Sequence, residues 1–381
     1  MDVMINMEKE PIRVLQVLSS LNTGGTELYV VNNYRNLNKK DVQFDFLIST
    51  DNDNDYYEQE VKSYGANVFH LANNGNIINQ MRRNYLFFKQ NNYSIIHINS
   101  CSLKDILIAS IPAKCANIPH IIAHAHSPGT PKKSRLDYIL RWILKELISM
   151  TCTDYFACSK NVAKAKYPAR KLNRDVKIIN NAIDLNKFKY NSFKRSEIRN
   201  RYEIRDNDFL IGMVGRLEIE KNHSYMLEVF HLIKEENYKL IIIGSGSLLD
   251  SVSKSVDELN LTDRVIFTNR VDNVFDYYSA IDLLVLPSLY EGFPFVAVEA
   301  QATGCPILIS ENVTDDCLLL SQSKKIPIKN GVEDWKREIL FFKKNENRIQ
   351  AHKIVKDAGY SITDEVNKLT QIYESMENSY D

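Results

Sequence analysis

The sequence lacks several features that would each have indicated a class of protein. Its 381 residues carry no net charge, because 48 Lys and Arg balance 48 Asp and Glu. No motif interleaves aromatic and basic residues, which disfavours nucleic-acid binding. No apolar run approaches the length of a bilayer-spanning helix, and no secretory signal precedes the first strand-like segment. The six cysteines form no C-x-x-C pair, so we expect reduced thiols in the cytoplasm.

The length exceeds what one compact core usually holds and predicts two domains. Apolar strand-like runs that end in glycine or polar turns, each followed by a helical pattern, recur in both halves. Such runs are typical of parallel sheets in α/β domains. We place the domain seam in the polar stretch 188–203, which gives domains 1–188 and 189–381, and we predict a final helix over 362–376.

Two carboxylates stand eight residues apart near the carboxyl end. Glu291 follows the apolar strand 281–287, at a strand end where open α/β sheets bind ligands, and Glu299 lies one turn into the helix that begins at Phe295. Glu299 can accept hydrogen bonds from a ribose, Glu291 can reach a sugar ring, and Gly292 allows close backbone approach. The alternative is a pair of solvated surface charges.

Two cations flank the start of another predicted helix. Gly215 and Arg216 follow the buried strand 210–214, and Lys221 precedes a helical pattern. A planar Arg fork, a Lys point charge and the free N–H groups of a helix end suit a diphosphate. The alternative is an ordinary surface Arg and Lys.

The glycines of the turn at Gly244 and Gly246 match the start of the dinucleotide-binding fingerprint G-x-G-x-x-G. Leu249 holds the position of the third glycine, and the turn does not follow the first strand of its domain. We therefore expect Gly244 to line a nucleotide pocket without forming that fingerprint.

The first half offers a glycine pair and a histidine pair. Gly24 and Gly25 precede a helical pattern, so their amides can face a phosphate or sugar, although a flexible loop is the alternative. His124 and His126 point to one face of a strand, as metal ligands do, but no third ligand is evident nearby. We interpret His97 as a buried residue at a strand end.

An acidic run at 51–55 also resembles a metal motif. Tyr56, however, occupies the position that must be glycine in a calcium loop. We expect a solvated loop there and predict no metal site.

Together these motifs resemble the retaining glycosyltransferases of the GT-B fold, family 4, and are most similar to the bacterial capsule and exopolysaccharide enzymes. The resemblance runs from about Ile12 to the end of the chain. It implies two Rossmann-like domains that face each other across a cleft, with the final helix crossing back to the first domain. The first domain would then serve the acceptor and the second would bind the nucleotide-sugar.

The resemblance also assigns roles to individual residues. Those it implies to be catalytic are His126, Arg216, Lys221 and Glu291. Those it implies to bind the nucleotide-sugar are Gly24, Gly25, Gly215, Gly244, Val271, Gly292, Phe293, Pro294 and Glu299. The chain departs from the family pattern at Ala182, which replaces a usual glycine, so the loop must avoid a positive φ or tolerate some strain. It also departs at Phe295, where many relatives carry a polar residue.

The expected activity is transfer of a hexosyl or N-acetylhexosaminyl group, with retention, from a nucleotide-sugar to a lipid-linked or polysaccharide acceptor in capsule or exopolysaccharide synthesis. UDP-sugar is the expected donor, and no cofactor or metal is expected. The alternatives are a UDP-sugar epimerase of the same fold and a catalytically silent partner subunit.

Charge is divided unevenly between the halves. Residues 1–190 contain 25 Lys or Arg and 17 Asp or Glu, whereas 191–381 contain 23 and 31, which gives +8 and −8. Within the basic half, the stretch 132–145 places five apolar side chains on one helical face beside five cations. This pattern predicts peripheral contact with an anionic membrane; the alternative is a helix packed on the core. The five apolar residues are Leu136, Ile139, Leu140, Ile143 and Leu144.

Overall fold

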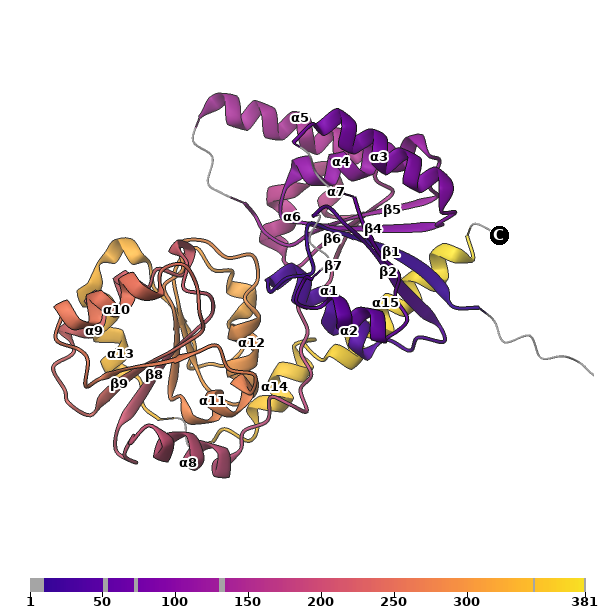
Figure 1. Cartoon of the computed structure of the whole chain (residues 1–381). Coiled ribbons are helices and arrows are strands. Elements are labelled where there is room, and N and C mark those ends of the chain that lie inside the picture. Colours follow the sequence, from indigo (N-terminus) through magenta and orange to yellow (C-terminus); the bar gives the residue numbers. More distant parts are fainter. Residues whose placement is uncertain (1–9, 51–53, 72–74, 130–133, 345–346, 380–381) are drawn as a thin grey trace, which may run out of the picture. The chain divides into compact units, whose positions relative to one another are not determined.

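The computed structural model describes residues 10–379 except 51–53, 72–74, 130–133 and 345–346. The chain divides into two compact units, each built on a parallel sheet (Figure 1). Unit 1 runs to Asn180 and resumes at Ile362, and unit 2 covers Asn181–Ser361. The prediction of an α/β protein with two Rossmann-like halves is confirmed.

Unit 1 contains a seven-stranded sheet in the order β3-β2-β1-β4-β5-β6-β7, and every pairing in it is parallel. All residues of the central strands β1, β2 and β4 except Arg13 are buried, as expected for a sheet covered on both faces. The strands are β1 (Ile12–Leu18), β2 (Val42–Ile48), β3 (Val68–His70), β4 (Ile95–Ser100), β5 (His120–Ala125), β6 (Asp154–Ala157) and β7 (Val176–Ile178).

Polar residues in the connections that follow strands cap several of the unit 1 helices. Side chains of Asn76, Ser102, Ser134 and Ser159 accept hydrogen bonds from the first turns of α3, α4, α5 and α6. The helices are α1 (Gly25–Asn36), α2 (Glu58–Ser63), α3 (Ile77–Gln90), α4 (Leu103–Cys115), α5 (Arg135–Thr151), α6 (Lys160–Lys166), α7 (Ala169–Leu172) and α15 (Ile362–Glu377). The last of these, α15, packs on α1, β1 and β4.

Unit 2 contains a six-stranded sheet in the order β10-β9-β8-β11-β12-β13, also parallel at every pairing. The fully buried side chains of Phe230 on α9 and Trp335 on α13 belong to its hydrophobic core. The strands are β8 (Phe209–Val214), β9 (Tyr238–Ile243), β10 (Val265–Asn269), β11 (Leu283–Leu286), β12 (Ile307–Ile309) and β13 (Lys324–Lys325). The helices are α8 (Ser192–Arg201), α9 (His223–Leu232), α10 (Leu249–Glu258), α11 (Val274–Ala280), α12 (Phe295–Ala302), α13 (Val332–Phe341) and α14 (Ala351–Asp357), with short 3-10 turns at Ile219–Lys221, Asp315–Cys317 and Ile328–Asn330.

The units change at residue 180, eight residues before the seam at 188 that the polar composition predicted. The segment between them belongs to unit 2 because Ile183 forms a parallel bridge to Ser361 and its N–H donates to the Tyr360 carbonyl at 3.0 Å. Phe188 then packs its ring against Tyr278. These backbone and ring contacts join residues 183 and 188 to unit 2 before the polar stretch begins.

Candidate active site

Two glycine turns meet at the carboxyl ends of β8 and β9. Gly215 and Gly244 have φ of 148° and 144°, a region that side chains other than glycine rarely adopt. A Cβ on Gly244 would lie 1.9 Å from the Gly215 carbonyl oxygen, and the Leu217 N–H donates to the Ser245 carbonyl at 3.0 Å. The two turns are therefore fixed against each other at the edge where parallel sheets bind ligands.

Lys221 and Glu291 lie together at this edge. The Lys221 ammonium forms an ion pair with Glu291 Oε1, and the Ser288 hydroxyl donates to the same oxygen at 3.1 Å. Both side chains are largely buried, so this pair is held more firmly than a surface ion pair. The geometry joins one predicted diphosphate residue to one predicted sugar residue.

Backbone contacts position this pair. Asn222, in the left-handed region at φ 59°, turns the chain into α9, and its amide donates to the Pro287 carbonyl at 3.1 Å. The Leu289 N–H donates to the Glu220 carbonyl at 2.8 Å. The loop after β8 is thus tied to the loop after β11 on both sides of the ion pair.

Arg216 has a different environment from Lys221. Its side chain is 61% exposed and pairs with Glu220 at 3.2 Å. Exposed ion pairs contribute little to stability, so the guanidinium can turn toward an anion at small cost. Arg216 therefore stands at the rim of the Gly215 turn, whereas Lys221 lies inside it.

Glu299 is buried on α12, with 8% of its surface exposed. Its Oε2 accepts a hydrogen bond from the Tyr278 hydroxyl at 2.7 Å, and the described residues make no other hydrogen bond to it. Burial raises the pKa of Glu299 to about 7, while the Tyr278 hydrogen bond opposes that rise. Oε2 is thus occupied, whereas Oε1 accepts no hydrogen bond from a described residue.

The loop between the two glutamates is anchored mainly by its backbone and an aromatic ring. The Phe293 carbonyl accepts from the Asn181 amide at 2.9 Å, and the Phe293 ring stacks on Tyr360 with 5.2 Å between centroids. Pro294 is buried at the cap of α12, and Gly292 is half-buried before it. These contacts and this burial indicate that Phe293 and Pro294 hold the loop in place.

Two further sequence predictions concern residues outside that loop. Val271 lies half-buried between β10 and α11, near the carboxyl end of its strand. Ala182 does not have a positive φ, which confirms that the loop avoids the left-handed region after losing the usual glycine.

In unit 1, Gly24 and Gly25 lie where β1 leads into α1. Gly24 is the N-cap residue of α1 and has no side chain to cap the helix. A Cβ atom on Gly24 would lie 2.2 Å from Glu27 Oε2, which is too close. A Cβ on Gly25 would meet nothing within 4 Å. The Glu27 carboxylate therefore lies over the first turn of α1, at the carboxyl edge of the unit 1 sheet.

Asp55 corrects the prediction of a solvated acidic loop. Its side chain is buried and accepts from the Leu21 N–H at 2.5 Å and the Asn22 amide at 2.6 Å. It therefore holds the loop that leads to Gly24, a contact between distant residues that the local acidic pattern does not reveal. Asp51 and Asp53 lie outside the described residues.

His97, His124 and His126 are all buried at the carboxyl ends of β4 and β5. The rings of His124 and His126 lie 4.1 Å apart, so the expected shared face is confirmed. His97 is a buried strand residue, bonded to the Tyr373 hydroxyl at 2.7 Å and to His124 at 3.0 Å. Burial lowers the pKa of His126 to about 3. In the part of the chain that the structure describes, no three His, Cys, Asp or Glu side chains are grouped to hold a metal ion.

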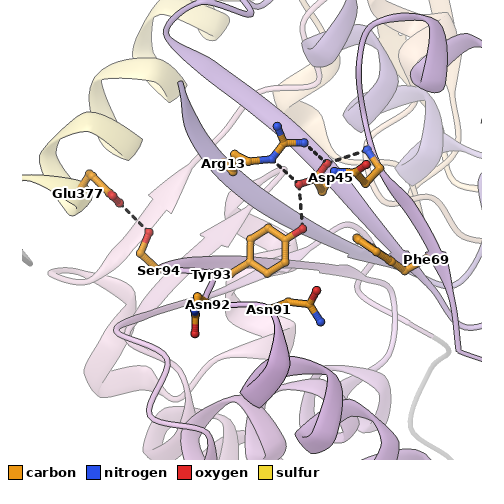
Figure 2. A pocket seen from close by; sticks show the side chains of 9 residues that line it. Arg13, Asp45, Phe69, Asn91, Asn92, Tyr93, Ser94 and Glu377 are labelled. Atoms are coloured by element: carbon orange, nitrogen blue, oxygen red, sulfur yellow. Dashed lines mark hydrogen bonds and ion pairs between the residues drawn. The ribbon is translucent and has the colours of Figure 1, made fainter. Parts of the chain in front are cut away.

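A hollow of about 400 Å³ lies at the opposite edge of the unit 1 sheet, near the amino ends of β1 and β4 (Figure 2). The Asp45 carboxylate there accepts two bonds from Arg13, at 2.6 and 2.8 Å, and one from the Tyr93 hydroxyl at 2.8 Å. The Asn67 N–H adds a fourth bond at 2.7 Å. Because all these donors already satisfy the carboxylate, we interpret this cluster as a structural anchor.

Three residues of the site were not predicted from the sequence: Ser288 and Tyr278, which bind the two glutamates, and Asn99, which binds His126 at 3.0 Å. Asn99 is the second-last residue of β4, and an amide near the carboxyl end of a buried strand is a signal that could have identified it. No sequence signal marks Ser288 or Tyr278, whose roles depend on the packing of α11 and the β11 loop.

Two family models match the chain: "Glycosyltransferase Family 4" over residues 23–187 and "Glycosyl transferases group 1" over residues 194–359. The Bacillus subtilis protein EpsF, which is named as a glycosyltransferase, is 31% identical over 319 residues, covering 81% of this chain and 82% of EpsF. An Escherichia coli protein named UDP-Gal:alpha-D-GlcNAc-diphosphoundecaprenol alpha-1,3-galactosyltransferase is 27% identical over 282 residues, covering 70% and 71%.

Solved structures share the fold. The crystal structure of Anabaena HepE in complex with UDP and glucose matches with a TM-score of 0.77 and 16% identity, over 96% of this chain and 100% of HepE. At that identity the likeness shows the fold alone. The identity to EpsF across four fifths of both chains, taken with the two family models, shows that this protein belongs to the family 4 glycosyltransferases of the GT-B fold and is an enzyme of that kind.

Proposed function

We propose that this glycosyltransferase transfers a hexosyl or N-acetylhexosaminyl group from a UDP-sugar to a lipid-linked or polysaccharide acceptor in bacterial capsule or exopolysaccharide synthesis. The observation that carries the proposal is the placement of Lys221 beside Glu291 at the Gly215 turn. A cation for a diphosphate and a carboxylate for a sugar hydroxyl then lie next to each other, as a nucleotide-sugar requires. Retention follows from the resemblance to the retaining members of the family.

The names of relatives support the choice of donor and acceptor. The Escherichia coli relative is named for a UDP-sugar and a lipid diphosphate acceptor, and two Staphylococcus aureus relatives are named for capsular polysaccharide biosynthesis. A Campylobacter jejuni relative is also named for a diphospho-undecaprenol acceptor. The recurrence of lipid diphosphate acceptors favours a lipid-linked substrate for this chain.

The chemistry at the leaving group follows from the charges. Departure of UDP leaves negative charge on the diphosphate, which Arg216, Lys221 and the amino end of α9 can stabilise without a metal. In the free protein Lys221 is already paired with Glu291, so a bound diphosphate must share or replace that carboxylate. Glu291 would then be released toward the sugar as the phosphate arrives.

Helix α5 supports the proposed contact with a membrane. Six large apolar side chains at helical spacing form an exposed row, which we call the α5 stripe, and each of them is at least 37% exposed. This exposure favours membrane contact over core packing for these six side chains, whereas Leu144 is half-buried, Ile148 is buried and α5 packs on α4. The α5 stripe consists of Leu136, Ile139, Leu140, Ile143, Leu147 and Met150.

The surroundings of the α5 stripe favour a lipid surface as its partner. Arg135, Arg141 and Lys145 lie on the same helix, and residues 1–180 of unit 1 belong to the half of the sequence with a net charge of +8. Lys132 and Lys133 lie outside the described residues. Among the described residues no helix is long and apolar enough to cross a membrane. We therefore propose peripheral attachment at the cytoplasmic face of the cell membrane, where anionic lipid and a lipid-linked acceptor meet.

The proposal is tested by incubating the purified protein with a panel of UDP-sugars, first alone and then with lipid diphosphate acceptors. A transferase consumes a UDP-sugar faster when an acceptor is present and releases UDP. Conversion of the sugar without an acceptor would instead identify an epimerase. Neither consumption nor binding of any nucleotide-sugar in a thermal-shift panel would identify a silent partner subunit.

A further inference from the structure

The side chain of Asn99 has a fixed orientation in the core of unit 1. Asn99 is 3% exposed at the end of β4. Its Nδ2 donates to the His97 carbonyl at 3.2 Å and to Gln16 Oε1 at 2.8 Å, and its Oδ1 lies 3.0 Å from His126 Nε2. A backbone carbonyl can only accept, so the NH2 group must face His97 and the amide oxygen must face His126.

This orientation decides where the imidazole proton of His126 lies. An amide oxygen can only accept, so His126 Nε2 must carry the hydrogen of the bond between them. Burial lowers the pKa of His126 to about 3, and the ring is therefore neutral near pH 7. A neutral imidazole with a proton on Nε2 has its lone pair on Nδ1.

The Nδ1 atom of His126 is a buried acceptor without a hydrogen-bond partner among the described residues. The Tyr29 hydroxyl and His124 Nε2 are also buried and unpaired, and both rings lie within 5.0 Å of the His126 ring, centroid to centroid. Buried polar atoms are seldom left unpaired in native proteins, and one at the ligand-binding edge of a sheet points to a missing partner. A hydroxyl can supply the hydrogen that Nδ1 lacks.

We propose that Asn99 is a positioning residue that holds His126 in the Nε2–H tautomer, so that Nδ1 accepts a hydrogen bond from a hydroxyl of the bound sugar. The tautomer rests on the Asn99 contacts and on the burial of His126, whereas the sugar as the ligand rests on the proposed function. The neighbouring pair behaves differently: His97 Nε2 and His124 Nδ1 bond to each other at 3.0 Å, and that bond can form with the proton on either ring. Asn99 removes this freedom from His126.

The tautomer can be measured directly by long-range proton–nitrogen NMR on protein labelled with 15N-histidine, with His126→Gln used to assign the signals. Wild type should show a protonated Nε2 and an unprotonated Nδ1 at pH 7. Asn99→Leu removes the acceptor and should give a mixture of tautomers. Asn99→Asp, as a carboxylate, keeps an oxygen that can only accept and should retain Nε2–H. Signals of His97 and His124 in each variant report that unit 1 remains folded.

Two outcomes of the NMR experiment would overturn the proposal. One is a wild-type His126 protonated on Nδ1 or on both nitrogens. The other is Asn99→Leu with the Nε2–H tautomer unchanged and His97 and His124 undisturbed. Both are independent of whether any nucleotide-sugar is turned over.

Kinetics then test the role of Nδ1. Loss of one hydrogen bond to the sugar should raise KM for the UDP-sugar about tenfold in Asn99→Leu, while Asn99→Asp should stay closer to wild type. UDP lacks the sugar group that is transferred, so its affinity should not change in either variant. If the NMR result holds but KM is unchanged in Asn99→Leu, the tautomer assignment stands and the sugar contact is wrong.

Discussion

Lys221 and Glu291, separated by seventy residues in the sequence, form an ion pair between the loops that follow β8 and β11. Ser288 donates a second hydrogen bond to the same glutamate oxygen. The free protein therefore neutralises the cation that we assign to the diphosphate with the carboxylate that we assign to the sugar. This relationship gives separate expectations for the two residues.

Removing either of the two cationic side chains that we assign to the diphosphate should slow transfer. Lys221→Ala or Arg216→Ala should lower kcat/KM by about a hundredfold or more, as loss of a group that stabilises developing charge does. Steady-state kinetics of the folded variants provide the measurement. Lys254→Ala, a change at a side chain that is 76% exposed on α10, is the matched control and should have no effect. Unchanged turnover in both Lys221→Ala and Arg216→Ala would remove the proposed phosphate site.

The two glutamates should differ in their effect on UDP binding. Glu299→Gln should weaken UDP, because a ribose contact is present in both substrate and product. Glu291→Gln should leave UDP affinity unchanged or increase it, because Lys221 loses its competing carboxylate, while the sugar is held less well. Titration calorimetry with UDP and with the UDP-sugar separates these effects. Weaker UDP binding by Glu291→Gln alone would reverse the two assignments.

Glu299 should also make stability depend on pH. Its folded pKa is raised from 4.5 to about 7, so its contribution to stability is fully present below pH 4.5 and is lost as pH rises through 7. Between pH 5.5 and 8 the loss amounts to about 2 kcal/mol. Urea unfolding at these two pH values should show Glu299→Gln gaining about that much relative to wild type at the higher pH. A pH-independent difference between the two proteins would contradict the raised pKa.

The sequence predicts the fold better than it predicts contacts within the site. Apolar runs such as 281–287, which precedes Glu291, reveal buried parallel strands, because burial on both faces leaves a continuous apolar signal. The pairing of Lys221 with Glu291 was not predicted, since it depends on the bonds of Asn222 and Leu289 between two loops. Asp55 shows the same limit: its partners Leu21 and Asn22 are more than thirty residues away.

Helix periodicity reveals an apolar face but not what covers it. The spacing of Leu136, Ile139, Leu140 and Ile143 predicted one face of a helix, and both core packing and membrane contact fitted that pattern. Only the placement of the neighbouring elements shows that the face is exposed. Conversely, nothing in the sequence shows that Tyr278 will occupy one oxygen of Glu299.

Transfer should not require a divalent metal. Arg216 and Lys221 supply positive charge at the proposed diphosphate site, and this is the charge that a metal provides in other nucleotide-sugar sites. Activity should therefore persist in excess EDTA, measured as UDP release in the presence of acceptor. Loss of activity in EDTA with rescue by magnesium or manganese would contradict this, and Asp53→Asn would then be the variant to examine.

The α5 stripe should bind anionic liposomes reversibly. Apolar side chains that enter the lipid interface gain about 1.5 kcal/mol or more each, and each basic side chain near an anionic surface adds about 1 kcal/mol that salt screens. Co-sedimentation should rise with the fraction of anionic lipid and fall as salt is added. Ile139→Ser with Ile143→Ser should weaken binding at all salt concentrations, because it removes the apolar contribution.

Charge and apolar contributions can be separated with two further variants. Replacing Lys132, Lys133 and Arg135 with Glu should weaken binding mainly at low salt, because screening already removes the electrostatic contribution at high salt. Phe193→Ser is the matched control: this side chain is 86% exposed on α8, in the half with a −8 balance, and its loss should not change sedimentation. If wild type ignores anionic liposomes even at low salt, α5 does not contact lipid, and the acceptor must reach the enzyme from solution.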